Sequence, residues 1–240
     1  MKSYGQFCPV AKAAELFCER WTPLILRDLT LGASRFSELQ RGVPLMSATL
    51  LSRRLKQLES EGVIQRKRAA SGKSWTYHLT AAGAEFAPLV VALGVWGRRW
   101  TRRALAAHEV NVAALAWTLE RTLKPDAFGP ERCTVLLKFR DQPAQKSKWW
   151  FVNEEGALEI CLKDPGHDVD LYVTTTVKDM IYVVRGDLAL SRALDENRMD
   201  LVGPRALRMQ FRAWLNLGPL AKIKSQRADG GRIEPAVNAG

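Results

Sequence analysis

The chain has 240 residues, with 36 lysines and arginines against 25 aspartates and glutamates, so its formal net charge is +11. A hydrophobic share of 47% is that of an ordinary globular protein and excludes a protein that is basic and disordered throughout. The longest apolar stretches, such as 89–96, are far shorter than the ~20 residues of a membrane span, and no secretory signal follows Lys2. We therefore expect a cytoplasmic protein with no membrane partner. Its positive charge favours a polyanionic partner, most commonly nucleic acid.

The positive charge is concentrated in the first half of the chain. Residues 1–122 hold 18 basic and 9 acidic side chains, a net charge of +9, whereas residues 123–240 have a net charge of +2. The stretch 123–130 contains two prolines and a glycine, so it cannot continue a helix and marks a division. We therefore predict a basic domain over 1–122, a second domain over 123–224 and a flexible tail over 225–240.

The first domain begins with short helical patterns. Apolar residues recur at helical spacing over 10–17. Thr22 followed by Pro23 predicts the N-cap and first residue of a second helix, which Gly32 ends. A third, short helix is predicted over 36–42, and it precedes the most informative segment of the chain.

That segment, 48–59, predicts a helix with one apolar side and one side of hydroxyls and cations. Leu51, Leu55 and Leu58 fall on one stripe at about 100° per residue. The opposite side carries Thr49, Ser52, Arg53 and Lys56. Such side chains donate to phosphates and to guanine edges, and a helix fits the DNA major groove. With the short helix before it, this segment predicts a helix-turn-helix.

The side chains of this helix differ in the contact that we expect from them. Arg53 and Lys56 are the best candidates for base contact, and the two hydroxyls are weaker ones. Arg54 lies nearer the flank, where we expect it to meet a phosphate or an acidic partner. Ser47, directly ahead of the helix, joins the predicted DNA-binding residues.

A basic hairpin follows the recognition helix. After Gly62 the hydrophobic period changes from 3.6 to 2, which predicts short strands over 63–68 and 75–79. The cations at the tip of this hairpin are Arg66, Lys67, Arg68 and Lys73. A basic hairpin in this place is a wing, which can lie against the minor groove or the phosphate backbone, and we predict that Arg66, Arg68 and Lys73 contact DNA.

Long apolar helices come next. Thr80 predicts the N-cap of a helix over 81–107, which carries an apolar stripe from Leu89 to Trp100, and a second apolar run covers 110–123. This is more apolar surface than a small winged helix buries by itself. We therefore expect a homodimer that forms through these helices.

Five runs of the first half follow one another in unbroken order over about residues 7–100. They are Cys8-Pro9-Val10-Ala11, Trp21 to Leu29, Arg35 to Leu39, Leu51 to Glu59 and Tyr77 to Gly83. Together they resemble the HxlR family of bacterial winged helix-turn-helix transcriptional regulators. The resemblance implies a dimer bound to double-stranded DNA at a palindromic operator, and it leaves repression or activation open.

Strand and helix patterns alternate in the second half. Strands are predicted over 132–140, 149–152, 157–162, 168–173 and 199–203, and helices over 177–184, 187–197 and 204–217. This makes an α+β domain. The predicted fold class of the whole chain is therefore α+β, with an N-terminal winged helix-turn-helix and long dimerisation helices ahead of this domain.

The order of these elements over about 130–218 is similar to the sterol-carrier-protein-like (SCP-2-type) domain. The resemblance implies a tunnel between sheet and helices that binds lipids or other small apolar molecules. The large apolar residues that could line such a cavity are Trp149, Trp150, Phe151, Met180, Ile181, Phe211 and Trp214. The alternative is that most of them form the core.

The cysteines are scattered and lack the spacing of a zinc site, and the histidines lie apart from them, so we expect no metal and no cofactor. Cys8 matches the cysteine that some HxlR-type regulators use for redox sensing. It sits ahead of a predicted helix N-terminus, where the helix dipole favours the reactive thiolate. An unreactive, partly buried thiol is the alternative.

Two main functions remain open, and a redox-sensing regulator that uses Cys8 is a further alternative. The first is a dimeric DNA-binding transcriptional regulator whose C-terminal domain binds a small apolar effector that modulates operator binding. The second is a lipid or hydrophobic-ligand carrier whose DNA module only regulates its own gene. We expect no enzyme, because no Ser-His-Asp set and no G-x-S-x-G elbow is recognisable. The run Ser71-Gly72-Lys73-Ser74 is no phosphate-binding loop, because Lys67 stands where such a loop needs its first glycine.

Overall fold

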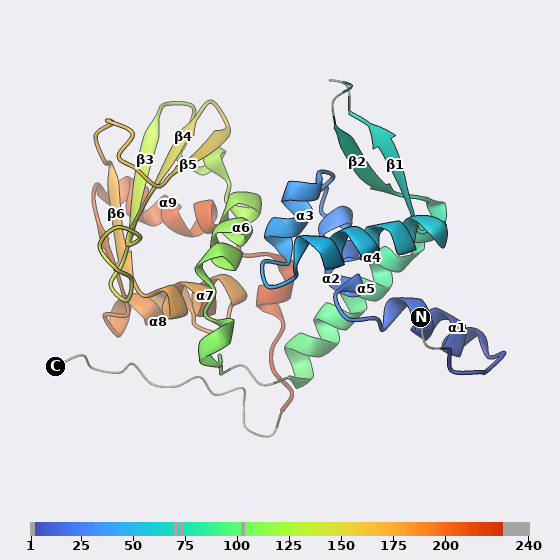
Figure 1. The fold of residues 1–240 in the computed structure, drawn as a ribbon. Coiled ribbons are helices and arrows are strands. Elements are labelled where there is room, and N and C mark those ends of the chain that lie inside the picture. The colour runs from blue at the N-terminus through green and yellow to red at the C-terminus, as the bar shows by residue number, and fades with distance from the viewer. Residues whose placement is uncertain (1–2, 70–71, 73, 102–103, 228–240) are drawn as a thin grey trace. The chain divides into compact units, whose positions relative to one another are not determined.

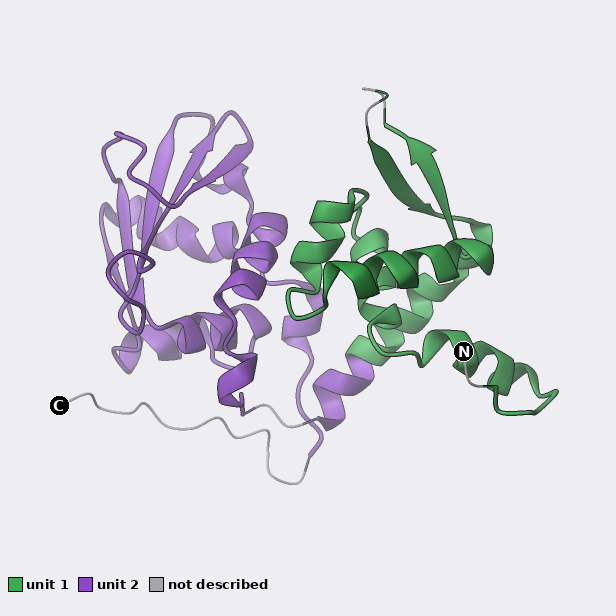
Figure 2. Cartoon of the chain, in the orientation of Figure 1, with its two compact units in different colours: residues 1–94 green, residues 95–240 purple. Residues whose placement is uncertain are grey.

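The computed structural model describes residues 3–69, 72, 74–101 and 104–227. The chain forms two compact units, Met1–Gly94 and Val95–Gly240 (Figures 1 and 2). The division therefore falls earlier than the predicted one at 122/123. Among the described residues, no helix has both the length and the apolar character needed to cross a membrane.

The first unit has the predicted order of helices and strands. Its elements are α1 (Pro9–Phe17), α2 (Thr22–Thr30), α3 (Phe36–Gly42), α4 (Ala48–Ser60), β1 (Ile64–Arg68), β2 (Trp75–Leu79) and the beginning of α5 (Ala81–Trp100). The two strands pair antiparallel, and α4 precedes them directly (Figure 1). This is a helix-turn-helix followed by a two-stranded wing, as the sequence predicts.

Side-chain caps fix the beginnings of two of these helices. Ser47 accepts a hydrogen bond from a backbone N–H in the first turn of α4 at 3.3 Å. The predicted N-cap Thr80 is confirmed, because its hydroxyl accepts from the N–H of Gly83 at 3.1 Å. The predicted N-cap at Thr22 is wrong by one residue. Trp21 takes that position in a left-handed conformation, with φ of 79°, and Thr22 is the buried first residue of α2.

The core of the first unit lies behind α4. Leu51, Leu55 and Leu58 are at most 1% exposed, so the apolar stripe of α4 faces inward as predicted. A side chain at Gly83 would collide with the carbonyl oxygen of Val63. The first turn of α5 therefore lies directly against the start of the wing, and a residue without a side chain is required at this contact.

The second unit is an α+β domain around one mixed sheet. Its elements after α5 are α6 (Val112–Thr122), β3 (Cys133–Phe139), β4 (Lys148–Glu154), β5 (Ala157–Cys161), β6 (Leu171–Thr175), α7 (Val177–Arg185), α8 (Leu190–Asp195), β7 (Met199–Val202) and α9 (Arg205–Leu215), with short 3-10 turns at Ala107–Glu109, Pro125–Phe128 and Pro219–Lys222. The strand order is β5-β4-β3-β6-β7. Among the neighbouring strand pairs that the structure describes, β3–β6 is parallel and the others are antiparallel.

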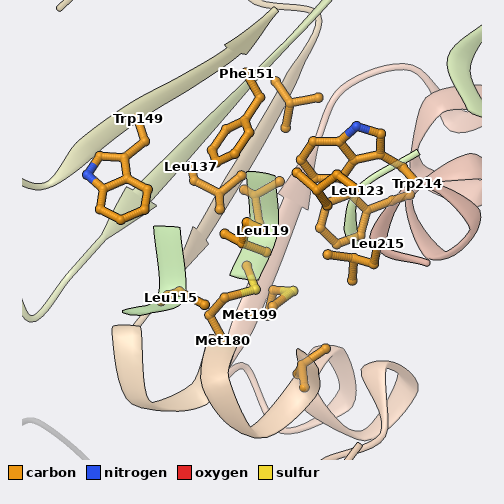
Figure 3. Close-up of a cluster of buried hydrophobic side chains, with 14 of the residues drawn as sticks. Leu115, Leu119, Leu123, Leu137, Trp149, Phe151, Met180, Met199, Trp214 and Leu215 are labelled. Atoms are coloured by element: carbon orange, nitrogen blue, oxygen red, sulfur yellow. The ribbon is translucent and has the colours of Figure 1, made fainter. Parts of the chain in front are cut away.

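The helices of this unit share one core with the sheet. Figure 3 shows Leu115 and Leu119 of α6 in the same cluster as Leu137, Phe151 and Trp214. This explains the earlier division of the chain, because the run over 110–123 is part of this core. The prediction that this run forms a dimer surface is therefore wrong.

The long helix α5 ends at Trp100, short of the predicted 107. Its end is held within the second unit, where Arg98 Nη1 lies 2.7 Å from Asp187 Oδ1. The Asp187 side chain is fully buried and also lies 3.0 Å from the guanidinium of Arg185. Gln226 donates its backbone N–H to the carbonyl of Arg99 at 2.9 Å. A buried carboxylate needs such partners, so the last turn of α5 is fixed in this unit.

Candidate nucleic-acid interface

The outward side of α4 is a row of unpaired donors. Thr49, Arg53 and Lys56 are exposed and Ser52 is half-buried. None of the four side chains has a hydrogen bond or an ion pair with any residue that the structure describes. Their donors are therefore available to an external acceptor such as a phosphate oxygen or a guanine edge. The structure places these four predicted residues together on one face.

The turn before α4 is held by bonds to backbone carbonyls. Gln40 Nε2 donates to the carbonyl of Met46 at 2.6 Å, and Arg27 Nη2 donates to the carbonyl of Gly42 at 3.2 Å. Met46 is buried, and Ser47 then caps the helix. The start of α4 is thus fixed, which is where a recognition helix presents its first contacts.

Arg54 does not belong to this face. Its side chain is nearly buried, and Nη2 lies 2.8 Å from Glu19 Oε2 while Nη1 donates to Gln57 Oε1. The predicted phosphate contact of Arg54 is therefore wrong, and the acidic partner that the sequence analysis left open is Glu19. The reason is rotational, because Arg54 follows Arg53 by 100° and so faces the core side of the helix.

The wing carries a stack of arginines on an aromatic ring. The guanidinium carbons of Arg66 and Arg68 lie 4.5 Å and 5.1 Å from the ring centroid of Trp75. Arg68 pairs with Trp75 in the β1–β2 register, and Arg66 stands two residues away on the same strand face. Arg66 also lies 3.6 Å from Glu59. The predicted wing residue Lys73 lies outside the described residues.

The role of Trp75 was missed at the sequence level. The ring is 42% exposed, and two guanidinium groups lie over it. The signal that could have found it is the period of two: Arg66, Arg68 and the cross-strand Trp75 share one face. Burial raises the pKa of Tyr77, which pairs with Arg66 in the register, and the Arg66 charge partly opposes that shift. The Tyr77 hydroxyl therefore stays protonated at neutral pH.

The residues predicted to line a ligand cavity are packed as core. Trp214 lies beside Phe151 (Figure 3), with 5.6 Å between the two rings. The ring of Trp214 also lies 5.5 Å from that of Phe211, and its Nε1 donates to Asn153 Oδ1 at 2.7 Å. Met180 is fully buried, and Ile181 is half-buried against the same cluster.

The two tryptophans of β4 cannot line one cavity together. Trp149 belongs to the core cluster and contacts the ring of Phe139 at 5.1 Å, whereas Trp150, its neighbour along the strand, faces the other side of the sheet. The alternative left open in the sequence analysis, that most of these side chains are core, is therefore the one that the packing supports.

Cys8 lies where the sequence places it, at the N-cap of α1, and it is half-buried. Cys133 differs, because it is buried in the second unit and burial raises its pKa to about 11, with a further contribution from Asp170. The Cys133 thiol is therefore protonated and unreactive at neutral pH.

Taken together, a capped helix with exposed donors and a basic two-stranded wing define a winged-helix DNA-binding protein. The model of the HxlR-like helix-turn-helix family matches residues 16–105. The chain is 36% identical over 98 residues to the uncharacterized HTH-type transcriptional regulator YvaP of Bacillus subtilis, a match that covers 40% of this chain and 91% of that protein. The chain belongs to the HxlR-like helix-turn-helix family and is a transcriptional regulator of that type.

Two further relatives extend the comparison. An uncharacterized HTH-type transcriptional regulator of Synechocystis, sll1512, is 34% identical over 97 residues, covering 40% of this chain and 72% of that protein. The solved structure of the reduced form of the transcriptional regulator YodB from B. subtilis is 28% identical and covers 40% of this chain and 96% of that chain, with a TM-score of 0.36.

Replacement of Arg53 by alanine is expected to relax sequence preference. A bidentate contact between an arginine and a guanine is worth about 1–3 kcal/mol of discrimination, so operator affinity should fall by that amount while affinity for random DNA changes little. Competition binding with operator and random duplexes measures the difference. Arg54→Gln is the matched neighbour: it should lower the thermal unfolding temperature, because it removes the pair with Glu19, and leave sequence preference intact. Equal preference in wild type and Arg53→Ala would show that Arg53 reads no base.

Replacement of Trp75 by alanine is expected to weaken binding to operator and random DNA by the same factor. The ring orders two arginines, and a cation–π contact is worth about 0.5–1 kcal/mol, so about a fivefold loss on both duplexes is expected. Fluorescence anisotropy with labelled duplexes measures it. Trp75→Phe keeps an aromatic face and should recover most of the affinity. A loss confined to the operator would mean that the ring itself reads sequence.

Proposed function

We propose that this protein is a homodimeric, cytoplasmic transcriptional regulator that binds a palindromic operator and responds to a small effector through its second unit. The observation that carries DNA binding is the face of α4, where Thr49, Ser52, Arg53 and Lys56 are held outward without partners in the described chain. The protein acts by binding and not as an enzyme.

The face of α5 supports a dimer. Leu89, Leu93, Trp96 and Trp100 recur at i, i+4, i+7 and i+11, so they form one stripe along the helix. Each of them is between 44% and 57% exposed in the single chain. Four large apolar side chains in one row form an exposed patch of the kind that marks a protein interface. A second copy of the same chain can cover this patch when the stripes of the two copies pack against each other.

The first helix supports the same conclusion. None of the residues of α1 is buried, although Val10 and other apolar side chains recur at helical spacing. A nine-residue helix is marginal in water on its own, because most of its stability in proteins comes from a packed face. Its end is held by the stacked rings of Phe17 and Phe86, whose centroids are 5.4 Å apart. The partner chain supplies the missing cover.

The two-fold symmetry of a dimer matches the symmetry of a palindromic operator. Two recognition helices related by a two-fold axis engage one face of B-DNA when their half-sites lie about 34–36 Å apart, one helical turn. Any change that alters this separation weakens binding.

We propose the second unit as the sensing part, with a sterol-carrier-like fold. It has its own sheet and core, its predicted elements follow one another in the expected order, and its half of the sequence is nearly neutral in charge. The last turn of α5 is fastened inside it through Arg98 and Asp187. An effector shifts the regulator only when it binds two of its states with different affinity.

Footprinting on the DNA upstream of the gene tests the function. Wild type is expected to protect two half-sites one turn apart, and Leu93→Glu, which places a charge in the stripe, is expected to give a monomer by sedimentation and to lose the footprint. Val91→Glu is the matched control: Val91 is 55% exposed but lies about 200° around α5 from Leu89, so it should leave dimer and footprint intact.

Three results would change this conclusion. A wild-type monomer at micromolar concentration would refute the dimer, and the absence of any protected site would refute operator binding at that DNA. A footprint that no extracted or added small molecule alters would favour the carrier, with the DNA module as an autoregulator.

A second candidate function is redox sensing through Cys8. The thiol stands at the N-cap of α1 and is half-buried, so small oxidants can reach it. Diamide treatment is then expected to abolish the footprint in wild type and in Cys18→Ser, a control at the other end of α1, but not in Cys8→Ser. Retention of the footprint in diamide-treated wild type would rule this function out.

A further inference from the structure

An open hollow of about 450 Å³ lies in the second unit where α8, β7 and α9 meet (Figure 1 labels the two helices). Small-molecule sites occupy about 300–1,000 Å³. The apolar side chains that a ligand can reach at the bottom of the hollow are Leu194 and Leu201, which are half-buried, whereas Met199 is fully buried in the core of the unit. Met209 is 74% exposed and therefore stands at the rim.

Two arginines line the same hollow. Arg205 and Arg208 stand three residues apart on α9, so they lie on one face of the helix. Both are exposed, and neither side chain has an ion pair or hydrogen bond within the part of the chain that the structure describes. The acidic residue of the lining, Asp200, lies 3.8 Å from Arg140, which compensates its charge. The hollow therefore has an excess of positive charge.

The chemistry of the lining selects a ligand class. Guanidinium groups bind carboxylates in a planar, often bidentate geometry, which favours a carboxylate over a neutral polar group. The exposed Met209 favours an aromatic body over the apolar bottom, because thioether sulfurs make favourable contacts with ring edges. A purely apolar ligand would leave both arginines unused.

We propose that this hollow binds a small aromatic carboxylate, with its carboxylate on Arg205 and Arg208 and its ring against Leu194, Leu201 and Met209. The proposal names the ligand class of the sensing unit, and only its regulatory consequence rests on the proposed function. It also moves the ligand away from the side chains around Trp214, which are packed as core.

Calorimetric titration of the full chain without DNA tests the site. The probes are 2-naphthoate, its neutral analogue 2-naphthamide, and decanoate, which has the same charge without a ring. We expect saturable binding of 2-naphthoate and about tenfold weaker binding of both other probes, because each lacks one of the two contacts. Equal or tighter binding of decanoate would overturn the aromatic class, and equal binding of 2-naphthamide would overturn the role of the arginines.

Variants assign the binding to the hollow. The double variant R205Q/R208Q is expected to bind 2-naphthoate about tenfold more weakly. Arg212→Gln is the matched control, because Arg212 is exposed on the same helix but outside the lining, and it should bind like wild type. Met209 is exposed, so Met209→Glu should fold normally, and its carboxylate should repel the anion and weaken binding. This variant tests the site if the double variant unfolds. Unchanged binding in the folded variants, or no saturable binding to wild type, would refute the site.

The footprint with 2-naphthoate present separates the site from its consequence. If 2-naphthoate binds in the titration and also changes the footprint, the hollow is supported as the effector site. Binding in the titration with an unchanged footprint retains the site and refutes its regulatory role. If 2-naphthoate changes the footprint of R205Q/R208Q as much as it changes that of wild type, the compound acts at another place. That result overturns the proposed site but not the response of the regulator to an effector.

Discussion

The burial of three leucines on α4 is the constraint on which the DNA-binding surface depends. Leu51, Leu55 and Leu58 are at most 1% exposed, so the helix cannot rotate about its axis without exposing them. Burying a leucine is worth about 1.5–3 kcal/mol each, far more than any single surface contact. The rotation of α4 is therefore set from behind, and Arg53 and Lys56 point outward as a consequence. The hydrophobic core thus positions the polar face that we propose to contact DNA.

The same constraint explains what the sequence could predict about the interface. Helical periodicity was enough to place the outward row of α4, because one strong apolar stripe determines the opposite side. It was not enough for Arg54, which lies at the edge between the two sides. Whether an arginine there meets DNA or the protein depends on a carboxylate distant in sequence, and Glu19 supplies it at 2.8 Å. Trp75 escaped notice for a related reason, since the strand register that places it beside Arg66 and Arg68 is a pairing between strands and not a property of either strand.

In the second unit the sequence predicted elements but not the space between them. The strands and helices follow the predicted order, because alternation and helical spacing report which side of each element is buried. They do not report whether the buried side chains meet or leave a cavity. Trp214 shows the difference: its ring fills the centre against Phe151 and Phe211, and its N–H is satisfied by Asn153. A pattern of large apolar residues is the same for a closed core and for a tunnel, and only packing decides between them.

The two apolar runs on either side of residue 101 have similar composition but different surroundings in the structure. The run over 110–123 closes the core of the second unit, whereas the stripe on α5 stays open. One helix therefore carries both the surface proposed for dimerisation and, at Arg98, an ion pair with the buried Asp187 of the second unit. The loss of either arginine partner would destabilise this buried carboxylate, so a rearrangement around Asp187 is coupled to the last turn of α5. Because Trp96 and Trp100 flank Arg98 on that turn, the proposed dimer surface and the second unit share the same few residues. In the proposed dimer, that sharing would connect an effector bound in the second unit to the spacing of the two recognition helices.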